Sequence, residues 1–244
     1  MPPTTFAPNV ESSLRTIARY QLMPHLLREQ LIDQAIASLS CPAKQIECAL
    51  QTFYQHHQLD TTEQQQEWCD RYQLQPTDVI HLATRSLRIE QFKEQMWGNK
   101  IESYFLKRKA DLDRATYSLI RVQDPALAQE LFFRLQGQEQ SFATLANTYS
   151  EGPEAKSDGK VGPVAMGTIH PHLAKCLRVS QPGQLWPPTR LGSWRAIVQL
   201  NQWLPAQLDT AMHQQLLNEL YELWLQTQIQ QLPACDRAWF PKVS

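Results

Sequence analysis

Histidine and cysteine are the residue types that most often bind metals or act as nucleophiles and proton carriers, and the chain has seven histidines and five cysteines. The cysteines form no C-x-x-C pair and lie far apart: Cys41, Cys48, Cys69, Cys176 and Cys235. Their spacing therefore predicts neither a metal site nor a redox motif, and their odd number predicts free thiols in a reducing compartment. We expect a function that needs no metal and no cofactor.

A glycine-containing stretch, YSEGPEAKSDGKVGP at residues 149–163, is a more specific signal. It holds three of the eight glycines, whereas no glycine precedes Gly98. Functional glycines cradle phosphates, form tight turns or let the backbone approach another group closely. The stretch follows a predicted helix and its spacing fits neither a dinucleotide fingerprint nor a P-loop. The sequence therefore predicts a backbone that bends sharply and then runs as a strand beside another segment.

The elements that must position this loop are short and of mixed type. RATYSLIRV at residues 114–122 is β-branched and aromatic, which predicts a strand. Asp124 and Gly137 are the N-cap and end signals of a helix between them. Further expected elements are a helix ending at Tyr149, a short helix around residues 170–177 and a closing strand at 194–200. This order predicts a small α+β domain.

Residues 1–111 predict helices only, because apolar residues recur three or four positions apart and glycine is nearly absent. Asp60 followed by Glu63 predicts a capping box at the start of one of these helices. After Pro205, one long helix carries a wide apolar stripe that must be covered. We expect it to pack on the N-terminal helices. A helical domain of residues 1–111, completed by residues 205–232, would then hold the α+β domain of residues 112–203 as an insertion.

Several spaced motifs within residues 112–203 resemble one family. F-x-x-L-A-x-x-Y-S at 142–150 is followed by G-x-V-G at 159–162, M-G-T-I at 166–169, Q-P-G-Q-L at 181–185 and G-x-W at 192–194. This series is similar to the parvulin-type (PpiC, rotamase) peptidyl-prolyl isomerase domain. The flanking helices resemble those of the SurA, PrsA and trigger-factor class of chaperones, and cyanobacterial parvulins associated with export machinery look most alike. The resemblance implies a four-stranded antiparallel sheet wrapped by helices, with a shallow apolar pocket for a prolyl ring.

The resemblance also assigns the substrate-binding walls of that pocket to Val161, Met166, Ile169 and Leu173. Any one of these residues alone would be interpreted as an ordinary core residue. Together, at spacings that match the family's, they favour a pocket. Rotation about a peptide bond faces a barrier of ~18–20 kcal/mol. An apolar pocket that fixes the ring and removes water from the amide favours the twisted state, in which the charge separation of the planar amide is lost.

Three positions depart from the family pattern. The family's two histidines are matched by Tyr117 in the first strand and Trp194 in the last, and its Asp or Cys is matched by Gly152. The polar half of the family's catalytic site is therefore replaced while the apolar half persists. We expect isomerase activity that is weak or lost.

Composition limits the other function classes. The net charge is −1 and the isoelectric point is about 6.7, which argues against a nucleic-acid or acidic-membrane partner. No apolar run reaches the length of a membrane span, and MPPTTFAPNVESSLRT at the start lacks the pattern of a secretory signal. We expect a cytoplasmic protein.

The sequence as a whole predicts a peptidyl-prolyl cis/trans isomerase and folding chaperone that acts on unfolded or export-bound, proline-containing polypeptides. Two alternatives stay open. The fold could serve as a peptide-binding platform without catalysis, or the helices could dock the chain onto a secretion apparatus.

Overall fold

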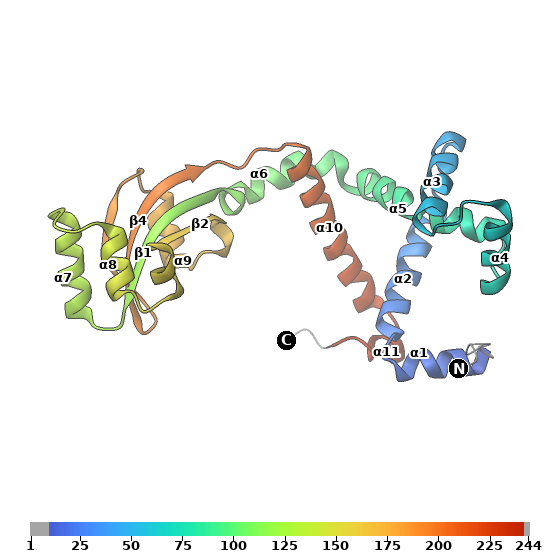
Figure 1. Ribbon diagram of the computed structural model, residues 1–244, viewed down its shortest axis with the longest axis horizontal. Helices are drawn as coiled ribbons and strands as arrows, with labels where there is room; N and C mark the ends of the chain where they lie inside the picture. The colour runs from blue at the N-terminus through green and yellow to red at the C-terminus, as the bar shows by residue number, and fades with distance from the viewer. Residues whose placement is uncertain (1–9, 242–244) are drawn as a thin grey trace. The chain divides into compact units, whose positions relative to one another are not determined.

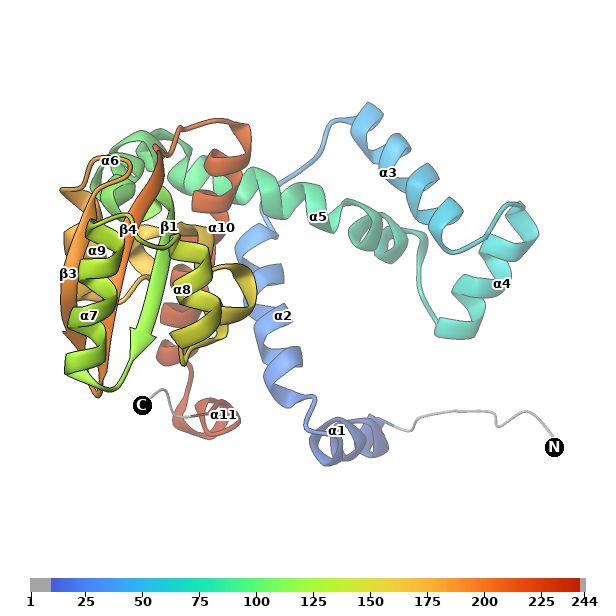
Figure 2. The ribbon, with the colours of Figure 1, turned by 60° about the vertical axis from the view of Figure 1, so that its left-hand side comes forward.

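The computed structural model describes residues 10–241 and divides the chain into two compact units (Figures 1 and 2). One unit comprises residues 102–212, and the other comprises residues 1–101 together with 213–244. The first nine residues of the predicted helical domain lie outside the described residues. The functional domain boundaries expected at residues 111 and 203 stay predictions.

The unit of residues 102–212 is built on a four-stranded sheet. Its strands are β1 (Arg114–Val122), β2 (Lys160–Ala165), β3 (Leu185–Leu191) and β4 (Trp194–Leu204). The strand order is β2-β1-β4-β3 and all neighbouring strands are antiparallel. With helices around this sheet, the predicted α+β class is confirmed.

Side chains alternate between the two faces of the sheet, as strand geometry requires. Helices α7 (Pro125–Gln136) and α8 (Phe142–Tyr149) cover one face, where Ile120 and Ile197 are fully buried. Helix α9 (Pro171–Arg178) packs on the other face against a second buried cluster that includes Leu119 and Val198. The sheet therefore has two cores, one on each side.

Local signals fix the ends of the helices on the first face. The Asp124 side chain accepts a hydrogen bond of 2.8 Å from the Ala126 amide and caps α7, as its sequence signal predicts. Ser141 caps α8 in the same way through the Thr144 amide at 3.1 Å. After α8 the chain passes through two short 3₁₀ helices, η2 (Pro153–Ser157) and η3 (Met166–Thr168), on either side of β2.

Two glycines shape the turn into β2. Gly159 and Gly162 have φ values of +74° and +104°, a backbone conformation that residues other than glycine rarely adopt. A Cβ atom at residue 162 would lie 2.5 Å from the carbonyl oxygen of Ala115 on β1. The predicted sharp bend and close backbone approach are therefore confirmed.

The chain enters and leaves the sheet at adjacent points. Arg114, the first residue of β1, pairs with Leu204, the last residue of β4. One residue earlier, the buried Asp113 carboxylate accepts hydrogen bonds of 2.7 Å from the Ala206 amide and from Lys109 on α6 (Ile101–Leu112). The two connections of the sheet are thus tied to each other.

The other unit contains helices only among its described residues. They are α1 (Val10–Arg19), α2 (Met23–Ile36), α3 (Ala43–His56), α4 (Thr62–Tyr72), α5 (Pro76–Trp97), the 3₁₀ helix η1 (Gly98–Lys100), α10 (Thr210–Gln231) and α11 (Ala234–Arg237). The capping box at the start of α4 lies one residue later than predicted. Thr61 accepts from the Gln64 amide while the Gln64 side chain accepts from the Thr61 amide, so Asp60 and Glu63 are not the capping pair.

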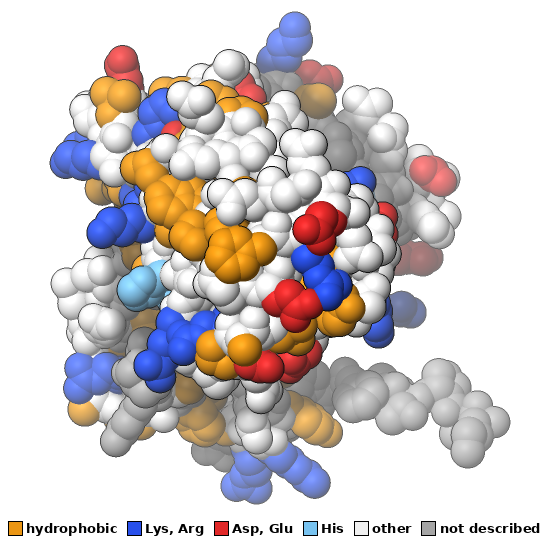
Figure 3. All heavy atoms as spheres, turned by 90° about the vertical axis from the view of Figure 1, so that its left-hand side faces the viewer, with side chains coloured by type: hydrophobic (Ala, Val, Ile, Leu, Met, Phe, Trp, Pro, Cys, Tyr) orange, Lys and Arg blue, Asp and Glu red, His pale blue; other side chains and the backbone are white. Residues whose placement is uncertain are grey.

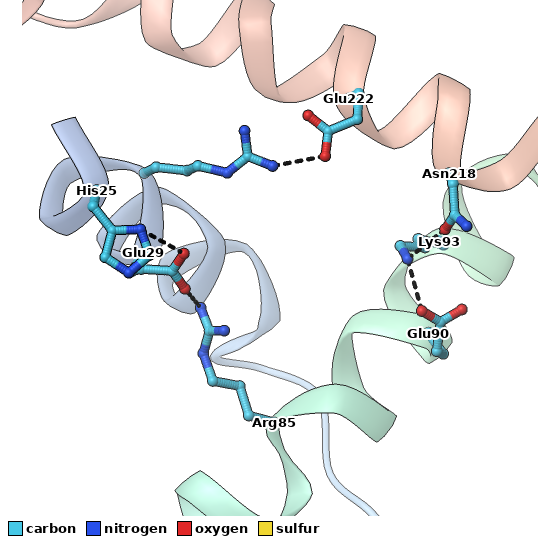
Figure 4. Close-up of polar contacts among 8 residues, drawn as sticks. His25, Glu29, Arg85, Glu90, Lys93, Asn218 and Glu222 are labelled. Atoms are coloured by element: carbon cyan, nitrogen blue, oxygen red, sulfur yellow. Dashed lines mark hydrogen bonds and ion pairs between the residues drawn. The ribbon is translucent and has the colours of Figure 1, made fainter. Parts of the chain in front are cut away.

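Helix α10 packs on α2 and α5, although they are more than a hundred residues apart in sequence. Tyr221 and Leu225 of α10 share a buried cluster with Ile32 and Ile36 of α2. Figure 4 shows polar contacts around this core. Arg28 of α2 forms an ion pair of 2.6 Å with Glu222 of α10, and Lys93 of α5 donates to Asn218 of α10 at 2.7 Å. Within residues 10–241, every helix is too short or too polar to cross a bilayer.

Candidate functional site

A cavity of about 610 Å³ opens on the α9 face of the sheet. Its floor comes from β1, where Tyr117, Leu119 and Arg121 point to the same face because they are two residues apart. The bend into β2 and the start of α9 provide the walls, and the β3–β4 connection contributes Leu191 and Trp194. Loops and strand ends that are far apart in sequence therefore meet around one hollow.

Three of the four residues assigned to the apolar walls line this cavity: Val161, Ile169 and Leu173. The fourth, Met166, is fully buried and belongs to the same core cluster as Leu173 without being one of the lining residues. The cavity thus has one apolar side, formed where β2 and α9 meet the sheet.

Tyr117 and Trp194, which we predict to stand where the family has histidines, also line the cavity and leave it open. Tyr117 is buried, and this burial is the main reason that the pKa of its phenol lies above the ordinary value of 10.0. No hydrogen bond links its hydroxyl to any of the described residues. The neutral Tyr117 hydroxyl is therefore available to donate or accept a hydrogen bond in the cavity.

An ion pair that the sequence did not reveal lies on the same floor. Arg121 Nε and Nη2 donate to the two carboxylate oxygens of Glu154 at 3.0 Å and 2.6 Å. Ser150 Oγ donates to the same carboxylate at 2.7 Å. Burial alone would raise the pKa of Glu154, but the hydrogen bonds from Arg121 and Ser150 outweigh it and hold this pKa below its ordinary value. Both members of the pair are charged at neutral pH.

Gly152 lies beside this ion pair and is not one of the lining residues. A Cβ atom there would be 2.5 Å from Arg121 Nη2 and closer still to the Glu154 carboxylate. The pair therefore occupies the space that a side chain at residue 152 would need. Strand alternation from Tyr117 could have placed Arg121 on this face, whereas nothing in the sequence signals the partner role of Glu154.

His170 is the remaining ring at the edge of the cavity. Its Nδ1 accepts a hydrogen bond of 3.3 Å from the His172 amide and caps α9. Lys160 and Ser157 complete the polar edge. Over residues 10–241, His, Cys, Asp and Glu side chains do not gather in threes with metal-binding geometry. The cavity can accordingly hold a small apolar ring against one side and offer hydrogen-bond donors on the other.

Comparison with protein families gives one match within the sheet unit. Residues 121–202 match the family described as "Rotamase: PPIC-type PPIASE domain". The matched segment contains most of the cavity lining, including Arg121, Glu154 and the apolar side.

Comparison with individual proteins extends the likeness beyond that segment. The chain is 28% identical over 168 residues to the foldase protein PrsA of Halalkalibacterium halodurans. This match covers 62% of this chain and 48% of that protein. The chain therefore spans about half the length of this curated relative. The structure of PrsA from Bacillus cereus is 15% identical with a TM-score of 0.46, covering 98% of this chain and 88% of that one. A PpiC-type isomerase domain is 22% identical with a TM-score of 0.39, covering 41% and 99%.

Proposed function

We propose that this chain, whose residues 121–202 are a parvulin-type peptidyl-prolyl isomerase domain, catalyses cis/trans isomerisation of prolyl bonds in unfolded or export-bound polypeptides. The helical unit would act as a chaperone module that holds such chains near the isomerase domain. The observation that carries this proposal is the cavity of about 610 Å³ with its apolar side at Val161, Ile169 and Leu173.

The proposed chemistry is a rotation and breaks no covalent bond. X-Pro bonds interconvert over tens to hundreds of seconds because the planar amide is stabilised by resonance. The apolar side would hold the prolyl ring while the rest of the peptide turns, and a cavity that excludes water disfavours the charge-separated planar amide. The Tyr117 hydroxyl, which has no hydrogen bond within the described chain, would orient a polar group of the peptide.

Replacement of the family histidines supports low activity. A net hydrogen bond is worth about 1 kcal/mol, which is several-fold in rate. Tyr117 retains one hydroxyl, while Trp194 can only donate through its indole nitrogen. We expect measurable isomerisation that is one or two orders of magnitude slower than in a parvulin with the full polar set.

The test is an NMR exchange assay on short X-Pro peptides, with Leu173→Ala and Leu177→Ala as a matched pair. Both residues are buried on α9, one turn apart, but only Leu173 lines the cavity. Loss of similar volume should cost each variant about 2–5 kcal/mol of stability. At a temperature where both stay folded, Leu173→Ala should lose most of the acceleration and Leu177→Ala should retain it. A wild-type rate equal to that in buffer would reject the proposed activity.

A second candidate is a peptide-binding chaperone without catalysis. It is favoured by large apolar side chains that stay exposed on the helical unit, among them Tyr20, Tyr72, Leu82, Leu87 and Met96. Leu82 and Leu87 of α5 also line a groove of about 530 Å³ whose other side is α3. On the sheet unit, the face in Figure 3 shows a short band of hydrophobic side chains with acidic and basic ones nearby. Suppression of client aggregation by a variant with no isomerase activity would favour this function.

Cellular placement belongs to the same proposal. We propose that the protein acts in the cytoplasm, and its five free cysteines support this because reducing compartments keep thiols unpaired. Fractionation of cells would test this, and recovery of a membrane-bound transporter component with the chain would instead favour the adaptor for a secretion apparatus.

A further inference from the structure

The ion pair of Arg121 and Glu154 is the feature that the family resemblance leaves unexplained. Glu154 is only 4% exposed and its carboxylate accepts three hydrogen bonds from side chains. A buried charge is costly unless it is paired and hydrogen-bonded, and here the pairing is bidentate. The two side chains therefore hold each other in one orientation.

This orientation leaves part of Arg121 unused. Its Nε and Nη2 are bound to Glu154, while Nη1 has no partner among the described residues. The Arg121 side chain is 29% exposed and lines the cavity on the same face as Tyr117 and Leu119. Of the charged groups around the cavity, the other cation is Lys160, an exposed residue on β2. A guanidinium fixed on one edge presents its free nitrogen with little further loss of entropy, which a flexible lysine cannot do.

We propose, building on the isomerase function above, that Arg121 is a substrate-binding residue and Glu154 its positioning residue. Arg121 Nη1 donates a charge-assisted hydrogen bond to a backbone carbonyl oxygen of the bound peptide, outside the bond that rotates. The ring then rests on the apolar side while the main chain is held at the floor. This contact forms with the ground state and the twisted state alike, so it lowers KM and leaves kcat nearly unchanged.

The experiment compares wild type with the double variant Arg121→Met, Glu154→Gln. Changing both residues avoids leaving an unpaired buried carboxylate, and Gln can still accept from Ser150. We expect KM for a short X-Pro peptide to rise about tenfold or more, as for loss of a hydrogen bond to a charged group, with kcat changed less than about threefold. The single variant Glu154→Gln keeps the Arg121 cation but no longer holds it in one orientation. Its KM should therefore lie between those of wild type and the double variant.

Arg134→Met is the matched control, because Arg134 is also ion-paired, to Glu130 on α7, but does not line the cavity. Its KM should equal that of wild type. A folded double variant with wild-type KM would overturn the proposal, and so would a fall in kcat with KM unchanged.

Peptide affinity separates this inference from the isomerase function. If wild type binds the peptide in an NMR titration without accelerating isomerisation, the isomerase function is rejected. The proposed contact of Arg121 is then tested by the Kd of the peptide alone. The same tenfold weakening in the double variant would then support the contact, and an unchanged Kd would overturn it. Wild type that neither binds nor isomerises the peptide would overturn both.

Discussion

At the residue scale, the cavity replaces one set of polar groups with another. Gly152 stands where we predict the family's Asp or Cys, and the Arg121–Glu154 pair fills the space beside it. A glycine here follows from that packing, since any side chain would have to displace the pair. The polar groups beside residue 152 therefore come from two residues on β1 and η2.

The lowered pKa of Glu154 predicts a specific dependence of stability on pH. Its folded pKa lies below the ordinary value of 4.5, so the pair contributes its full stability above that value and loses it as pH falls through the folded pKa. Glu154→Gln should therefore be less stable than wild type at pH 7, and the gap should narrow as the pH is lowered from about 5 towards 3. Thermal unfolding of both proteins over this range measures the effect.

Glu102→Gln is the control, because Glu102 is exposed on α6. It should unfold with the same pH profile as wild type. A difference between wild type and Glu154→Gln that stays constant with pH would contradict the assigned role of the carboxylate.

The family resemblance revealed only half of this site. The apolar positions could be predicted because they stand in spaced motifs, and Val161, Ile169 and Leu173 do line one cavity. The ion pair could not, because Arg121 and Glu154 are 33 residues apart and only the fold brings them together. Whether the assigned residues act in catalysis stays a prediction.

At the scale of the elements, most of the helices and strands of the sheet unit could be predicted from the sequence. The β1 strand and the Asp124 cap of α7 follow from β-branched periodicity and N-cap chemistry. The β3 strand could not be predicted from the sequence, because Pro187 and Pro188 argue against a strand. It lies at the edge of the sheet with a register shift between Trp186 and Thr189, where proline is tolerated.

The pairing of β1 and β2 predicts unequal effects for two glycine substitutions. Gly162 and Gly183 both have positive φ, but a Cβ at 162 would collide with backbone whereas one at 183 meets nothing within 4 Å. Gly183→Ala should lower the free energy of unfolding by about 1–2 kcal/mol, because alanine is less stable than glycine in a left-handed conformation. Gly162→Ala should cost clearly more, because β1 and β2 must also separate. Denaturant unfolding compares the two, and equal losses would mean that the close approach at β2 is relaxed without cost.

At the scale of the whole molecule, one chain builds two compact units, and each has buried clusters of its own. The wide apolar stripe on α10 was a sufficient signal that this helix needs partners, and α2 and α5 supply them.

This separation predicts that damage to one core stays local. Leu225 on α10 is fully buried and Leu223, two residues earlier, is 49% exposed. Leu225→Ala should destabilise the helical unit by about 2–5 kcal/mol, whereas Leu223→Ala should change stability by no more than about 0.5 kcal/mol. Amide hydrogen exchange should show faster exchange in the helical unit of Leu225→Ala and unchanged protection in β1 and β4. Equal loss of protection in both units would show that they unfold as one.

The tie between the two connections of the sheet has an evolutionary consequence. Because Arg114 pairs with Leu204 and Asp113 holds the Ala206 amide, the domain begins and ends at nearly one point. A gene segment whose product has its two ends so close together can be inserted into another chain, or removed from it, without moving the flanking residues far apart.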